Sequence, residues 1–142
     1  QSDLLDLYGG VGSIGLPLAH KMKSVTIVEI NQEAVDFANQ NIEQNNIANA
    51  KAILAPTEKV LDEITPNHAV ILDPPRAGLH GAVVQRILEQ VPETVVYLSC
   101  NLSTQARDVQ RLLQRYEIVH QALYNYFPRT PHIEGLIVLK KK

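Results

Sequence analysis

Apolar residues follow two alternating patterns along this 142-residue chain. Short runs rich in Val, Ile and Leu are typical of buried strands, whereas apolar residues three and four positions apart are typical of amphipathic helices. The two patterns alternate almost to the end, which favours a parallel sheet with helices on both faces. The apolar runs predict seven strands, at residues 4–7, 25–30, 50–54, 68–73, 94–99, 116–126 and 133–139.

Several helices are expected to begin at residues with capping side chains. Asn31 is placed to cap one helix, Thr57 a weaker helix over 57–64, and Ser103 or Thr104 another. The last two strands have no helix between them, so they must pair antiparallel, and the last strand is expected to run against the others. The fold class is therefore α/β with a mostly parallel seven-stranded sheet. The helical patterns lie between the strands, near 14–19, 32–44, 57–64, 81–90 and from 103 onward.

Composition narrows the class of protein. With 45% hydrophobic residues, the chain is expected to form one domain over 1–142. It has no apolar run of about eighteen residues and a single cysteine, so we expect a cytoplasmic, monomeric protein without disulfides. The net charge of −2 gives no support for nucleic-acid binding through bulk charge. Only two residues precede the first strand, so we expect a domain cut from a longer protein.

A glycine-rich segment links the first strand to the first helix. Gly10-Val-Gly12-Ser-Ile-Gly15 matches the G-x-G-x-x-G pattern of dinucleotide-binding loops. Glu29 ends the second strand at about the spacing of an acid that binds ribose hydroxyls. A nicotinamide-dependent oxidoreductase is therefore one interpretation of this segment. The glycines alone are weak support for it, because they also permit close packing of helix against strand.

The residues ahead of the glycines favour another cofactor. Asp6 lies at the end of the first strand, and the segment Asp6-Leu-Tyr-Gly-Gly-Val-Gly resembles the D-x-x-x-G-x-G loop of class I S-adenosylmethionine methyltransferases. A terminal antiparallel strand after an α/β core is also how that superfamily ends. This resemblance implies a Rossmann-like fold.

Three more motifs lie where strands end or begin. They are Asp73-Pro-Pro-Arg76, Ser99-Cys100-Asn101 and the segment 127–134, Phe-Pro-Arg-Thr-Pro-His-Ile-Glu. Together with the first loop, they resemble the RNA (uracil-5-)-methyltransferase family over essentially the whole chain. The resemblance implies methylation of uracil C5 in transfer or 23S ribosomal RNA, and it identifies the chain as the C-terminal part of a longer enzyme.

Such chemistry needs a nucleophile and a base. Carbon 5 of uracil is a poor nucleophile until a thiolate adds to carbon 6, and a base must later remove the C5 proton. The family resemblance implies that Cys100 is the nucleophile and Glu134 the general base. The N-terminus of the helix after Cys100 can help to stabilise a thiolate. In the strand order that the resemblance implies, the last strand lies beside the fifth, which would make Cys100 and Glu134 neighbours.

The resemblance also implies the cofactor and the partner. The cofactor is S-adenosyl-L-methionine, the substrate is RNA held mainly by regions outside this chain, and no histidine spacing suggests a metal site. His132 is expected at most to orient its loop, and Arg107 and Asp108 to pair structurally. The expected cofactor-binding residues are Asp6, Tyr8, Gly10, Gly12, Ser13, Glu29 and Asp73.

Departures from the family pattern keep alternatives open. Leu102 stands where members commonly have proline after Ser-Cys-Asn, and Pro56-Thr57 stands where an Asp or Asn often binds adenine. A cofactor-binding module that is inactive without its RNA-binding part is therefore a second hypothesis, and the nicotinamide oxidoreductase a third. Cytosine-5 methyltransferases generally use two cysteines, and amino-group methyltransferases carry Asn-Pro-Pro-aromatic, so neither is favoured. The motifs do not distinguish transfer from ribosomal RNA.

Overall fold

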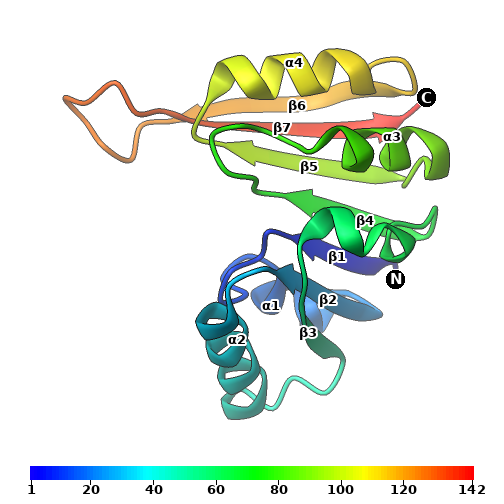
Figure 1. Cartoon of the computed structure of the whole chain (residues 1–142), viewed down its shortest axis with the longest axis vertical. Helices are drawn as coiled ribbons and strands as arrows, with labels where there is room; N and C mark the ends of the chain where they lie inside the picture. The colour runs from blue at the N-terminus through cyan, green and yellow to red at the C-terminus, as the bar shows by residue number, and fades with distance from the viewer.

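The computed structural model describes residues 1–142, and its seven strands form one mixed sheet in the order β3-β2-β1-β4-β5-β7-β6 (Figure 1). The strands are β1 (Asp3–Leu7), β2 (Ser24–Glu29), β3 (Ala50–Leu54), β4 (His68–Leu72), β5 (Thr94–Ser99), β6 (Tyr116–Tyr124) and β7 (Glu134–Lys141). The helices are α1 (Gly15–Leu18), α2 (Gln32–Gln44), α3 (Gly81–Gln90) and α4 (Leu102–Leu112), with 3-10 turns η1 (Ala19–Lys21), η2 (Thr57–Lys59) and η3 (Leu61–Glu63).

The strand directions confirm the predicted mixed sheet. The first five strands pair with one another in parallel, whereas β7 pairs antiparallel with both β5 and β6. A short connection allows only antiparallel pairing, which is why β7 runs against its neighbours. The predicted placement of the last strand beside the fifth is correct, and their pairing ends at Ser99 opposite Gly135.

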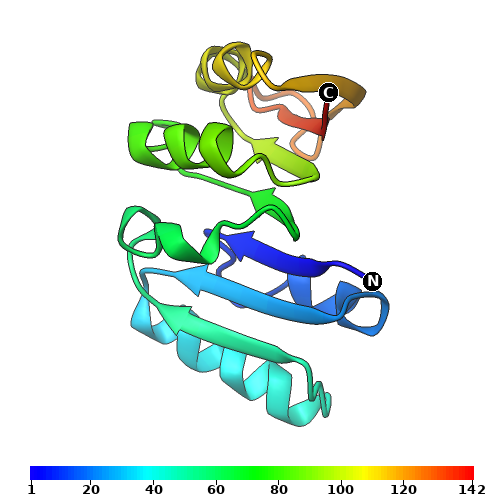
Figure 2. The same ribbon diagram turned by 90° about the vertical axis from the view of Figure 1, so that its right-hand side faces the viewer.

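Two apolar clusters hold helices against the two faces of the sheet. The larger cluster joins α3 and α4 to one face through residues such as Val84, Leu112 and the fully buried Tyr97. The smaller cluster joins α1 and α2 to the opposite face through Leu16 and Ala38. Figure 2 shows α3 and α4 stacked beside the β4–β5 half of the sheet, and α2 beside β3. Helices therefore cover both faces, as the alternating pattern predicts.

The prediction of a weak helix over 57–64 is wrong. Two separate 3-10 turns occupy this segment, and Val60 between them leaves the helical region with φ −122° and ψ 36°. Thr57 does not cap a helix, because it is buried as the first residue of η2 and Pro56 takes the cap position. So short a segment is marginal as a helix, since nucleation costs more than a few backbone hydrogen bonds return.

Capping decides where two longer helices begin. Asn31 caps α2 as predicted, because its side chain accepts a hydrogen bond from the backbone N–H of Ala34 at 3.0 Å. The predicted cap at Ser103 or Thr104 is wrong. Asn101 caps α4 instead and accepts from both of their backbone N–H groups at 3.1 and 3.4 Å. Helix α4 therefore begins only two residues after Cys100.

No helix combines the length and apolar character needed to cross a membrane. No group of three or more His, Cys, Asp or Glu side chains is arranged to hold a metal ion. The cytoplasmic location, the monomeric state and the domain boundary at 1–142 stay predictions.

Candidate active site

The predicted site residues gather along one edge of the sheet. Figure 1 shows the carboxyl ends of β4 and β5 pointing toward the same side as the loop between β6 and β7. The antiparallel β7 begins at this edge, so Glu134 at its start lies near the ends of the parallel strands. Ligands of open parallel sheets bind beyond the carboxyl ends of the strands.

The glycine segment after β1 is shaped by backbone that other residues rarely adopt. Gly10 and Gly12 have φ values of 54° and 83°, in the left-handed region that favours glycine. A Cβ on Gly12 would lie 2.6 Å from a methyl carbon of Leu16 and 2.8 Å from one of Ile27. A Cβ on Gly10 would meet nothing within 4 Å, so the backbone at Gly10 borders open space.

Asp6 ties this segment to the end of β1. Its Oδ2 accepts a hydrogen bond from the N–H of Gly15 at 2.9 Å, but its buried Oδ1 has no partner. Burial raises the pKa of Asp6 to about 6, against the opposing effect of the Gly15 hydrogen bond. A buried carboxylate oxygen without a donor needs a partner, and a bound ligand could supply one.

Glu29 is already largely satisfied by the backbone. One of its oxygens accepts from the N–H groups of Ile30 and Asn31 at 2.8 and 2.9 Å, and the other accepts from Gly10 at 3.0 Å. A carboxylate has about four acceptor positions, so one is left in this arrangement. Glu29 therefore positions the glycine segment and can accept a single further donor.

The first of two cavities at this edge joins three of the predicted cofactor residues. It measures about 390 Å³, and Tyr8, Glu29 and Asp73 contribute to its lining. Sequence reasoning did not assign Ile30, Glu58 or Pro75 to the site, although the cavity also has them in its wall. Pro56 and Thr57 line it too, at the place where the family pattern has an adenine-binding residue. The complete lining is Tyr8, Glu29, Ile30, Pro56, Thr57, Glu58, Asp73 and Pro75.

Ser13 is not brought to this cavity. Ser13 and Gly12 line a separate hollow of about 250 Å³ with residues of α1, Asn41 of α2 and Asn45, which follows α2. Nothing in the structure places the Ser13 hydroxyl beside Glu29 or Asp73.

The second cavity contains the cysteine. It also measures about 390 Å³ and is lined by Arg76, Cys100, Asn101, Leu102, Pro131, His132 and Ile133. The Asp73-Pro-Pro-Arg76 segment separates the two cavities, because Asp73 and Pro75 line the first and Arg76 the second. The Arg76 guanidinium makes no ion pair and contacts His132 Nδ1 at 3.0 Å.

Strand register places Glu134 beside the cysteine cavity. The β5–β7 ladder ends where Ser99 pairs with Gly135, so Cys100 and Glu134 are the two residues that come next beyond this last pair. Glu134 is not in the lining of either cavity, but it follows Ile133, which lines the second. Burial raises the pKa of Asp73, and the charge of Glu134 raises it further. Asp73 and Glu134 therefore lie close enough to influence each other.

Gln105 is a structural support that sequence reasoning missed. Its buried side-chain amide donates to the carbonyls of Tyr97 and Gly135, each at 3.0 Å. The amide thus joins α4, β5 and β7 next to Glu134. A glutamine at a helical core position is the one signal in the sequence, because a buried amide needs partners.

Asp108 holds the loop that carries Arg76. Its Oδ2 accepts from the N–H of Leu79 and the hydroxyl of Tyr97, both at 2.8 Å. Its Oδ1 accepts from Arg107 at 2.8 and 2.9 Å, and Arg107 also donates to the Ala77 carbonyl at 3.1 Å. The predicted pairing of Arg107 with Asp108 is confirmed, and its effect is to fix the segment after Arg76.

Replacing Asp108 with alanine should lower the free energy of unfolding by about 3 kcal/mol, because a buried amide N–H, a hydroxyl and a guanidinium lose their acceptor. Denaturant unfolding followed by circular dichroism measures this change. Asp62→Ala is the matched control, because Asp62 is a fully exposed partner of Arg86, and it should leave the midpoint unchanged. Equal midpoints for Asp108→Ala and the wild type would contradict the structural role.

Comparison with known proteins relates the chain to one family. The family model described as tRNA (Uracil-5-)-methyltransferase matches residues 1–68 and 58–142, which together span the chain. The chain belongs to the tRNA (uracil-5-)-methyltransferase family. The motifs that suggested this resemblance are therefore those of a true member.

Relatives of this tRNA (uracil-5-)-methyltransferase family member are much longer. An uncharacterized RNA methyltransferase of Nanoarchaeum equitans is 44% identical over 97% of this chain and 30% of its own length. The 23S rRNA (uracil(1939)-C(5))-methyltransferase RlmD of Aliivibrio salmonicida is 38% identical, with 97% of this chain and 32% of its own covered. The chain therefore spans about a third of the length of the curated relatives it matches.

Solved structures confirm the predicted class I methyltransferase fold. Pyrococcus abyssi tRNA (uracil-54, C5)-methyltransferase, solved with S-adenosyl-L-homocysteine, superposes with a TM-score of 0.89 at 38% identity, covering 98% of this chain and 34% of that one. An rRNA methylase from Streptococcus thermophilus shares the fold alone, with a TM-score of 0.78 at 17% identity. The family assignment favours a methyltransferase over the nicotinamide oxidoreductase that the glycine pattern left open.

Proposed function

We propose that this chain is the catalytic domain of an S-adenosyl-L-methionine-dependent enzyme that methylates uracil C5 in RNA. The single observation that carries the proposal is the β5–β7 register, whose last pair is followed by Cys100, in the wall of a cavity, and preceded by Glu134, next to that cavity. A thiol in a cavity and a carboxylate next to that cavity are the nucleophile and base that C5 methylation needs. The family assignment supports the same reaction.

The residues of the first cavity fit the proposed cofactor. Glu29 has one acceptor position left for a ribose hydroxyl, and Asp6 has an unpartnered buried oxygen at the base of the glycine segment. Gly10 leaves its backbone open to a ligand, and Gly12 keeps the turn close to β2. Tyr8 and Asp73 complete the wall. Ser13 takes part only if its loop changes conformation, since it lines another hollow.

Cys100 in the second cavity and Glu134 next to it are the residues proposed to act on the uracil ring. The Cys100 thiolate adds to uracil C6 and makes C5 an enolate carbon. When bound, S-adenosyl-L-methionine supplies an electrophilic methyl group. Glu134 then takes the C5 proton, the electron pair of that C–H bond re-forms the C5–C6 double bond, and Cys100 leaves as a thiolate. The relatives named above act on tRNA and on 23S rRNA, so the proposal extends to RNA and to neither one in particular.

Tritium release from RNA that carries tritium at uracil C5 tests the proposed target atom. We expect release that depends on S-adenosyl-L-methionine, with one methyl group incorporated for each tritium lost. The control is the same RNA without the cofactor. Methyl incorporation without tritium release would place the methyl group at another atom and contradict the proposal.

A second candidate is a cofactor-binding module that is inactive without an RNA-binding part. The observation in its favour is that the chain spans about a third of its relatives. Calorimetry with S-adenosyl-L-homocysteine, set beside the tritium assay, separates the two candidates. Binding of the ligand without tritium release favours the module, and tritium release by this chain alone excludes it. Binding of NAD instead of S-adenosyl-L-homocysteine would contradict both.

A further inference from the structure

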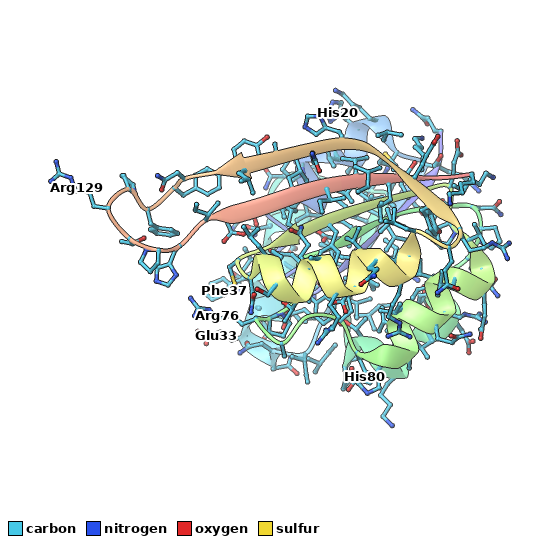
Figure 3. All side chains as sticks on the ribbon, turned by 90° about the horizontal axis from the view of Figure 1, so that it is seen from above. His20, Glu33, Phe37, Arg76, His80 and Arg129 are labelled. Carbon is cyan, nitrogen blue, oxygen red and sulfur yellow. The ribbon has the colours of Figure 1, made fainter.

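We propose that Tyr124, Tyr126 and Arg129 bind a single-stranded RNA segment beside the cysteine cavity, with a base stacked on the tyrosines. The segment 125–133 between β6 and β7 is called the arm. Figure 3 shows it extending away from the body of the molecule, with Arg129 at its tip. The inference rests on the proposed function for the identity of the neighbouring site, and it adds a binding surface for the nucleotides that flank the target.

The first tyrosine of the pair lies directly beside Glu134, the proposed general base. Tyr124 is the partner of Glu134 in the β6–β7 ladder. Gly135, the next residue, faces α4, because a Cβ there would collide with Gln105 and Leu102. Side chains alternate along a strand, so Tyr124 and Glu134 share the opposite face, which α4 does not cover. Cys100 and Glu134 come next beyond the last pair of the β5–β7 ladder.

The two rings are arranged to extend a base stack. Tyr124 and Tyr126 lie with ring centroids 5.7 Å apart and planes 5° from parallel. Tyr126 is 65% exposed, and the neighbouring Phe127 is 57% exposed. Large exposed aromatic groups beside a site indicate a binding surface, since burial would otherwise be favourable. A nucleic-acid base is a flat π system that stacks on such rings in a way that tolerates sequence.

The arm is held by local structure. Pro128 and Pro131 fix their own φ angles, and Thr130 donates to the Phe127 carbonyl from its N–H at 3.2 Å and its hydroxyl at 2.7 Å. Arg129 lies between them in the left-handed region, with φ 67°. A strained residue at a turn persists where its neighbours fix it. The backbone of the arm at Arg129 therefore has little conformational entropy left to lose on binding.

Charge makes RNA the favoured partner. The arm contains no Asp or Glu, and Arg129 makes no ion pair. Arg76, on the wall of the adjacent cavity, also lacks a carboxylate partner and contacts His132 of the arm. Two unpaired guanidinium groups beside stacked aromatic rings match the alternating phosphates and bases of a single strand. Within the arm Arg129 is the only Asp, Glu, Lys or Arg residue, so the arm has no carboxylate to repel a phosphate, although the whole chain has a net charge of −2.

Fluorescence anisotropy with a labelled single-stranded RNA that contains uridine tests the proposal in the full chain carrying Cys100→Ala, which cannot turn over. Tyr126→Ala should weaken binding about tenfold or more, whereas Tyr126→Phe, which keeps the ring, should bind as tightly as the parent. Arg129→Gln should weaken binding and reduce the slope of log affinity against log salt by about 1. Phe37→Ala is the control, because Phe37 is an exposed aromatic residue on α2, and it should change nothing.

Equal affinity of Tyr126→Ala and its parent would overturn the proposal, and so would equal loss in Phe37→Ala. Tighter binding of the matching duplex than of the single strand would overturn it as well, because paired bases cannot stack on the rings. The proposed function fails separately. RNA binding that depends on Tyr126 without tritium release would refute C5 methylation and support the RNA-binding role of the arm. Tritium release with RNA binding that does not depend on Tyr126 would support C5 methylation and refute the role of the arm.

Discussion

Replacing Cys100 with alanine is expected to abolish covalent capture of RNA that contains 5-fluorouracil. Fluorine at C5 cannot leave as a proton does, so an enzyme that adds a thiolate to C6 stays bound after methyl transfer. With the wild-type chain and S-adenosyl-L-methionine, the RNA should migrate with the protein on a denaturing gel. Without the thiol no bond to C6 forms, and turnover on ordinary RNA should fall by roughly 10⁴-fold or more.

The control for this variant is its cofactor binding. Cys100 lines the second cavity and not the first, so Cys100→Ala should bind S-adenosyl-L-homocysteine as tightly as the wild type, measured by calorimetry. An adduct that forms equally well in Cys100→Ala would show that another residue is the nucleophile. The chain has no second cysteine, so such a result would exclude thiolate chemistry altogether.

The sheet could be predicted because its signals are local. Each buried strand is an apolar run bounded by turn residues, and the missing helix between 116–126 and 133–139 forces an antiparallel pair. The segment 57–64 shows where such signals fail. Thr57 looks like a cap in the sequence, but its side chain is buried, and only the tertiary structure determines that.

The positions of Cys100 and Glu134 could be predicted only through family resemblance. Their sequence separation gives no hint of contact, and the register that brings them together depends on the order of β5, β7 and β6. The hydrogen bonds that hold the site residues in place are even harder to predict from the sequence. Gln105 joins three elements through two backbone carbonyls, and Glu29 uses three of its acceptor positions on the backbone. Such contacts follow from packing, and the only trace of them in the sequence is a glutamine at a helical core position.

Carboxylates converge on this edge in a way that bears on proton transfer. Asp6 lies in β1, Asp73 directly after β4 and Glu134 at the start of β7. The charge of Asp73 adds to burial in raising the pKa of Asp6 to about 6. The pKa of Asp73 is also raised, mainly by burial and in addition by the charge of Glu134. Burial and a neighbouring like charge both disfavour the ionised carboxylate, so Asp6 and Asp73 hold a proton more easily than exposed aspartates do. Glu134 is the member of the group that the β5–β7 register sets beside Cys100.

Replacing Glu134 with glutamine is therefore expected to stop the reaction after methyl transfer. The amide keeps the size of the side chain but cannot take the C5 proton, so Cys100 cannot leave. Turnover should fall by about 10³-fold, within the range for removal of a general base. Unlike the wild type, Glu134→Gln should accumulate a covalent complex with ordinary RNA, visible on a denaturing gel and carrying one transferred methyl group per adduct.

Asp73→Asn separates this role from a general effect of charge at the edge. It removes a neighbouring carboxylate that lines the first cavity, where we propose that the cofactor binds, so it should weaken binding of S-adenosyl-L-homocysteine without trapping ordinary RNA. An adduct in Asp73→Asn but not in Glu134→Gln would assign the base to Asp73. The C5 proton would then leave toward β4 instead of β7, because Asp73 follows β4 and Glu134 begins β7, on opposite sides of β5.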